Sequence, residues 1–115
     1  TGKDIKDILE QGATLSKGMI QISGLTFEYD SSKEEYARVG KVMMSDDTEL
    51  DLEKEYTVAT NDFLAGGQDN YVTLANFTWS DAYQAPLLRD ALKDDLMAKK
   101  TYTPMEEMRA VDTAK

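Results

Sequence analysis

A short stretch in the middle of the chain, NDFLAGGQDNY at residues 61–71, brings an aromatic, two glycines and an acid close together. Phe63 offers a flat apolar face that can stack on a base, and the carboxylate of Asp69 can accept hydrogen bonds from a sugar. Gly66 and Gly67 let the backbone between them bend tightly. Phe63 can equally be core packing, since most apolar aromatics are buried, and Asp69 can be a solvated loop carboxylate. The residue types alone leave both interpretations open.

The charge and the missing residue types exclude several kinds of site. The chain has 13 Lys and Arg against 22 Asp and Glu, a net charge of -9, so its surface repels a polyanion and we expect no nucleic-acid binding. It has no Cys and no His, which excludes a disulfide, a thiolate zinc site, a Ser-His relay and a His-based dimetal centre within it. Catalysis by this chain would therefore rest on carboxylates, Lys or Tyr.

The length sets the domain organisation. A chain of 115 residues, 41% of them hydrophobic, is long enough for one compact domain with a core and too short for two. It contains no run of about 18 apolar residues, so we expect no membrane contact from it.

The first part of the chain favours a helix followed by a strand. Residues 1–12 have a capping residue in Thr1 and an apolar face, and we expect the helix to stop at Gly12. Residues 19–30 alternate apolar and polar side chains, which is typical of a strand. The phase of the alternation slips at Gly24, which predicts a β-bulge there.

Two more strands and a helix follow. Apolar runs at 39–44 and 55–60 predict strands that pair antiparallel, because they are close in sequence. Residues 86–99 predict a helix that begins at Pro86, and residues 103–115 are expected to be an irregular tail. The helix repeats leucine at every fourth position: Leu88, Leu92 and Leu96. The fold class is therefore α+β, with a small, mostly antiparallel sheet flanked by helices.

The acidic run DDTELDLEKE at residues 46–55 is a candidate calcium site. It lacks the glycine-punctuated spacing of a calcium loop, so we interpret it as a solvated turn.

Three stretches together resemble the C-terminal domain of the 5′-nucleotidase family, which also serves 2′,3′-cyclic-nucleotide phosphodiesterases and UDP-sugar hydrolases. TGKDIKDILEQG is similar to the family's LTGxxLKxxLE helix, and MIQISGLTFEYD is similar to its QVSGLxFxYD strand. YTVATNDFLAGGQDNY is similar to its YxVATNDFLAxGGDGY signature. The order and spacing also agree over most of residues 1–71, and LLRDALKDDLMAKK stands where the family has its last helix.

The resemblance implies roles for the loop residues. Phe63 stands where family members place one of two aromatics that sandwich the nucleobase, and Asp69 stands where they place an acid that bonds the sugar hydroxyls. Gln68 and Asn70 replace two glycines of the family pattern. Asn tolerates the left-handed region, so we expect Asn70 to keep the backbone path. Gln68 leaves open how closely the loop backbone approaches a ligand.

The resemblance also implies a larger parent protein. The chain would be residues 1–115 of a partial substrate-binding domain, preceded by further strands and by an N-terminal metallophosphoesterase domain that binds two divalent metal ions. The expected function is nucleoside recognition in a nucleotide phosphohydrolase outside the cytoplasm, with a nucleotide or nucleoside as ligand. We expect this fragment to hold no cofactor and to be inactive by itself. The alternative is a non-catalytic extracellular binding or interaction module.

Overall fold

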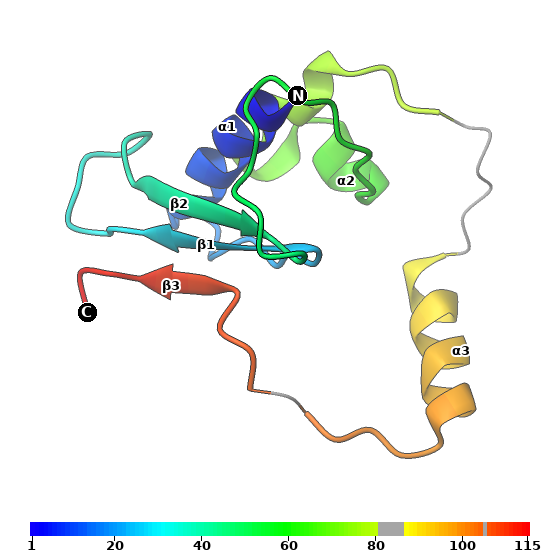
Figure 1. The fold of residues 1–115 in the computed structure, drawn as a ribbon. Coiled ribbons are helices and arrows are strands. Elements are labelled where there is room, and N and C mark those ends of the chain that lie inside the picture. Colours follow the sequence, from blue (N-terminus) through cyan, green and yellow to red (C-terminus); the bar gives the residue numbers. More distant parts are fainter. Residues whose placement is uncertain (81–86, 105) are drawn as a thin grey trace. The chain divides into compact units, whose positions relative to one another are not determined.

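The structure, a computed structural model, describes residues 1–80, 87–104 and 106–115 (Figure 1). The chain divides into two compact units, one formed by Thr1–Phe77 with Met108–Lys115 and the other by Thr78–Glu107. The first unit contains, in chain order, α1 (Gly2–Ala13), β1 (Leu25–Tyr29), β2 (Val39–Met44), α2 (Asp62–Ala65), the 3₁₀ turns η1 (Gln68–Asn70) and η2 (Leu74–Asn76), and β3 (Ala110–Asp112). The second unit contains α3 (Leu88–Lys99). The α+β class is confirmed.

The sheet of the first unit is mixed, with the strand order β2-β1-β3. β1 pairs antiparallel with β2 and parallel with β3 (Figure 1). The prediction of an irregular tail at 103–115 was wrong over β3, where the amide of Phe27 donates to the Arg109 carbonyl at 2.8 Å. A three-residue strand is too short to show a detectable alternation. It forms by pairing with β1, and because β1 lies far away in the sequence, no local pattern indicates the pairing.

The strand predicted at 55–60 does not form. Residues 48–50 already occupy the free edge of β2, since the amide of Met44 donates to the Thr48 carbonyl at 2.7 Å and the amide of Leu50 donates to the Val42 carbonyl at 3.0 Å. The following residues leave the sheet and run beside the start of α1, where the amide of Gly2 donates to the Lys54 carbonyl at 2.9 Å. Among the residues that the structure describes, the segment 55–60 therefore has no partner strand, and its strand propensity alone does not make it a strand.

The entry into β1 also differs from the prediction. β1 begins at Leu25, and the register irregularity lies between Phe27 and Tyr29, not at Gly24. Gly24 has a φ of +90°, which only glycine adopts without strain, and its carbonyl accepts the Ser45 hydroxyl at 2.7 Å. Gly24 thus turns the chain into the sheet.

The core of the first unit lies between α1 and the sheet. Its buried apolar cluster consists of Leu9, Ala13, Phe27, Val39, Val42 and Leu50. Thr1 caps α1 by accepting the amide of Asp4, as predicted. The helix does not stop at Gly12 but continues to Ala13. Gly12 serves packing instead, because a Cβ there would lie 2.6 Å from the Ile20 side chain.

The helix prediction in the second unit is confirmed for α3, while Pro86 lies outside the described residues. None of the residues of α3 is buried, and its three leucines are 75%, 59% and 40% exposed in chain order. Within the described ranges, no helix has both the length and the apolar composition that a bilayer span requires.

A buried carboxylate fastens α1 to the start of β2. Glu10 is 8% exposed, and its two oxygens accept the amides of Arg38 and Val39, each at 3.0 Å. The Arg38 guanidinium in turn donates to the carbonyls of Ala13 and Thr14, at 2.9 and 3.2 Å. The end of the helix and the start of the strand are therefore joined by charge-assisted hydrogen bonds in both directions.

We expect Glu10→Ala to lower the free energy of unfolding by about 2–4 kcal/mol, because it leaves the amides of Arg38 and Val39 without their acceptor. Urea denaturation measures the change. Asp7→Ala is the matched control, since Asp7 is an exposed acid on the same helix. Equal effects of the two substitutions would show that the Glu10 bonds contribute nothing specific.

Candidate functional site

The helix α2 presents Phe63 to solvent. Asn61 ends the extended segment before it and caps the helix, because its Oδ1 accepts the amide of Leu64 at 2.8 Å. The helix has a single turn and no buried residue, and the side chain of Phe63 is 52% exposed. In the part of the chain that the structure describes, its ring has no aromatic partner. Core packing therefore does not account for Phe63.

The two glycines after α2 have different roles. Gly66 closes the helix with an ordinary φ of -78°, whereas Gly67 has a φ of +84°. A Cβ on Gly67 would also lie 3.0 Å from the Cβ of Ala75. Only Gly67 therefore requires glycine for its conformation, while Gly66 adds an open backbone surface beside Phe63.

The loop continues through two residues in the left-handed region. Asp69 has a φ of +54° and Asn70 a φ of +72°. The expectation that Asn70 keeps a glycine-like path is confirmed. Gln68 has no positive φ, so a side chain there costs no backbone strain. For Asp69 and Asn70 the conformation costs about 1 kcal/mol each or somewhat more.

Asp69 lies at the surface and is available for a ligand. It is exposed, and its carboxylate accepts no hydrogen bond from any residue that the structure describes. A strained backbone conformation at a residue whose carboxylate is not engaged is typical of binding sites, where the surrounding structure holds the conformation.

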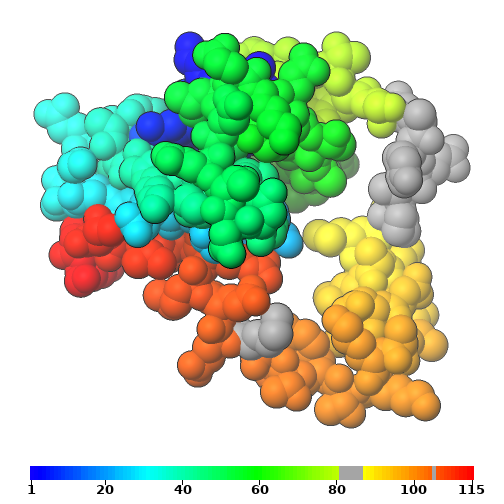
Figure 2. All heavy atoms as spheres, viewed as in Figure 1, coloured from blue at the N-terminus to red at the C-terminus, as the bar shows by residue number. Residues whose placement is uncertain are grey.

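The second aromatic of the motif, Tyr71, belongs to the core. It is 5% exposed, and its hydroxyl lies 3.2 Å from where a Cβ on Gly12 would be. Two residues later Thr73 is fixed to α1, because the Gln11 side chain donates to its hydroxyl and accepts its amide, the latter at 3.3 Å. The loop is thus anchored to α1 at its end. On the face shown in Figure 2, green atoms from the middle of the sequence lie in front of the blue atoms of the N-terminal helix.

The charge of Asp69 acts on the buried phenol of Tyr71. Burial raises the pKa of the Tyr71 phenol above its ordinary value of 10.0, and the negative charge of Asp69 raises this pKa further. The buried phenol of Tyr71 and the exposed carboxylate of Asp69 therefore interact electrostatically.

The acidic run at 46–55 uses its carboxylates locally. Asp46 accepts the amide and the hydroxyl of Thr48, and these bonds lower the pKa of its carboxyl. Asp51 accepts the amide of Glu53 at 3.0 Å. Among the described residues, no group of three or more His, Cys, Asp or Glu side chains is placed to hold a metal ion.

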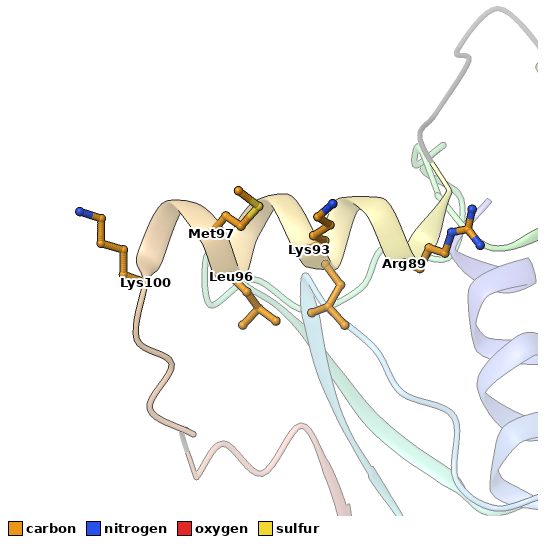
Figure 3. A pocket seen from close by; sticks show the side chains of 6 residues that line it. Arg89, Lys93, Leu96, Met97 and Lys100 are labelled. Atoms are coloured by element: carbon orange, nitrogen blue, oxygen red, sulfur yellow. The ribbon is translucent and has the colours of Figure 1, made fainter.

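A shallow groove runs along α3 in the second unit (Figure 3). It combines cationic and apolar side chains from one helix and its C-terminal cap: Arg89, Leu92, Lys93, Leu96, Met97 and Lys100. It offers neither an acid nor a histidine among its lining residues, so it lacks the groups of a catalytic or metal-binding site.

We expect Asp69→Asn to lower the pKa of Tyr71, because it removes the nearby negative charge, but to leave this pKa above 10, because burial is the larger cause. Titration of the tyrosine signals by NMR measures the shift. Asp62→Asn, which removes a neighbouring charge that does not act on Tyr71, is the control. An unchanged pKa in Asp69→Asn would place the carboxylate away from the phenol.

Comparison with known proteins gives consistent matches. The family described as "5'-nucleotidase, C-terminal domain" matches residues 1–76. A relative, "Cell wall protein Lmo0130" of Listeria monocytogenes, is 32% identical over an alignment of 116 positions that covers 96% of this chain and 15% of the relative. The crystal structure of a 5′-nucleotidase precursor from Thermus thermophilus has a TM-score of 0.83 at 26% identity, covering all of this chain and 24% of that protein. This chain therefore spans only a small part of both proteins, and it belongs to the 5′-nucleotidase C-terminal domain family.

Proposed function

We propose that this chain recognises the nucleoside end of a substrate for a metal-dependent nucleotide phosphohydrolase, a 5′-nucleotidase or 2′,3′-cyclic-nucleotide phosphodiesterase that releases nucleosides and phosphate. The observation that carries the proposal is the half-exposed ring of Phe63, held by a capped helix beside the glycine pair. Phe63 stacks on the base, and Asp69 accepts hydrogen bonds from the sugar hydroxyls. Gly66 and Gly67 let the backbone approach the ligand.

The reaction itself belongs to another part of the parent protein. This chain has no His and no Cys, and its described residues offer no metal-binding group, so no step through a metal is assigned to it. The two divalent metal ions would bind an N-terminal metallophosphoesterase domain of the parent protein and would activate a water there. The contribution of this chain is to hold the nucleoside so that the phosphate is correctly oriented.

We also propose that the protein acts outside the cytoplasm. Support comes from the names of two similar proteins, one a cell wall protein and the other a 5′-nucleotidase precursor.

In the full-length protein, we expect Phe63→Ala to lower kcat/KM for AMP by about 5- to 150-fold, since stacking on one base contributes about 1–3 kcal/mol. Hydrolysis of p-nitrophenyl phosphate, which has no base, should change little. Val72→Ala, at a similarly exposed apolar residue near the loop, is the matched control. Equal losses on the two substrates would mean that Phe63 supports the fold and not the ligand.

We expect Asp69→Asn to lower kcat/KM for ribonucleotides by about 12- to 160-fold, because a hydrogen bond with one charged partner contributes about 1.5–3 kcal/mol. Steady-state kinetics with AMP measures this loss. Asp47→Asn is matched in backbone conformation, because Asp47 also has a positive φ, of +64°, and is exposed. If Asp69→Asn behaved like this control, Asp69 would not be a sugar ligand.

A further inference from the structure

A hydrogen bond joins the candidate site to the loop between β1 and β2. The side-chain amide of Asn70 donates from Nδ2 to the Tyr36 hydroxyl at 3.0 Å, across 34 positions of the sequence. Tyr36 is 56% exposed and has a φ of +65°. Both partners are therefore residues with side chains in a backbone region that favours glycine. Their side chains meet each other and give these two strained positions a common support.

The loop that carries Tyr36 is fixed to the end of α1. Arg38, two residues further on, donates to the Ala13 carbonyl at 2.9 Å and to the Lys33 carbonyl at 2.9 Å. The amide of Ala37 donates to the Glu34 carbonyl at 3.2 Å, which closes a turn around Tyr36. These hydrogen bonds hold the turn that carries Tyr36, so its hydroxyl can hold Asn70 in place.

The site loop needs such a support. Asp69 and Asn70 are consecutive left-handed residues, and release of either would let the backbone relax towards ordinary φ values and redirect the Asp69 carboxylate. The Gln11–Thr73 bonds fix the loop only after Tyr71. Before that point, the Asn70–Tyr36 bond is the side-chain link that ties η1 to another element within the described residues.

We propose that Tyr36 is a positioning residue of the nucleoside site. Its hydroxyl holds Asn70, and through Asn70 it keeps Asp69 in the conformation that presents the carboxylate to a sugar. This proposal rests on the proposed function of Asp69. Tyr36 acts by reducing the conformational freedom that the loop loses when a ligand binds.

Hydrogen exchange tests the loop directly in the full-length protein. We expect Tyr36→Phe, which keeps the ring and removes the hydroxyl, to speed amide exchange in peptides covering residues 67–73 by about 2- to 10-fold, the effect of losing one hydrogen bond. KM for AMP should rise by a similar factor, while kcat and the hydrolysis of p-nitrophenyl phosphate stay the same. Tyr102→Phe, at a comparably exposed tyrosine, should change none of these.

A double-mutant cycle separates this role from a general effect on stability. Asn70→Gly removes the donor but suits the left-handed backbone, so Tyr36→Phe should have no further effect in that background. Additive effects of the two substitutions on KM would overturn the proposal, as would unchanged exchange in Tyr36→Phe.

The failure of the proposed function gives a different pattern. If Asp69→Asn and Phe63→Ala both left KM for AMP unchanged, the nucleoside site itself would be refuted, and the role of Tyr36 with it. If Asp69→Asn raised KM while Tyr36→Phe did not, only the positioning role of Tyr36 would be overturned.

Discussion

The burial of the last turn of α1 is the constraint on which the first unit depends. Three of its residues act in different ways: Glu10 accepts the two amides where β2 begins, Gln11 holds Thr73, and Gly12 leaves space for Ile20 and Tyr71. Polar groups that are buried without partners cost more than their bonds contribute, so these ties permit little rearrangement. One helix end therefore fixes the sheet and the candidate site relative to each other.

The candidate site combines this rigid anchor with a strained surface loop. Tyr71 is buried against α1, whereas Phe63 and Asp69, on either side of the glycine pair, remain exposed. A loop that is fixed from below and keeps its aromatic and its acid unengaged loses little conformational entropy when a ligand binds. The backbone strain at Asp69 and Asn70 also indicates that the loop is held in place, because such conformations persist where the surrounding structure enforces them.

Local signals in the sequence predicted local structure. The capping residue Thr1 marks the start of α1, and the tolerance of Asn70 for the left-handed region is confirmed, because each depends on neighbouring atoms only. The sheet was predicted less well: β3 and the unpaired segment 55–60 depend on which strand edge is already occupied, and no short window of sequence contains that information. The role of Tyr36 is not predictable from the sequence for the same reason, since its bond to Asn70 spans 34 positions and no neighbouring residue indicates it.

The most direct measurement is a crystal structure of the full-length protein with a nucleoside or a non-hydrolysable nucleotide analogue bound. We expect the base to lie against the Phe63 ring and a sugar hydroxyl to lie within about 2.5–3.0 Å of an Asp69 carboxylate oxygen. A ligand bound elsewhere, with Phe63 and Asp69 both in contact with solvent alone, would contradict the assignment of this loop as the nucleoside site.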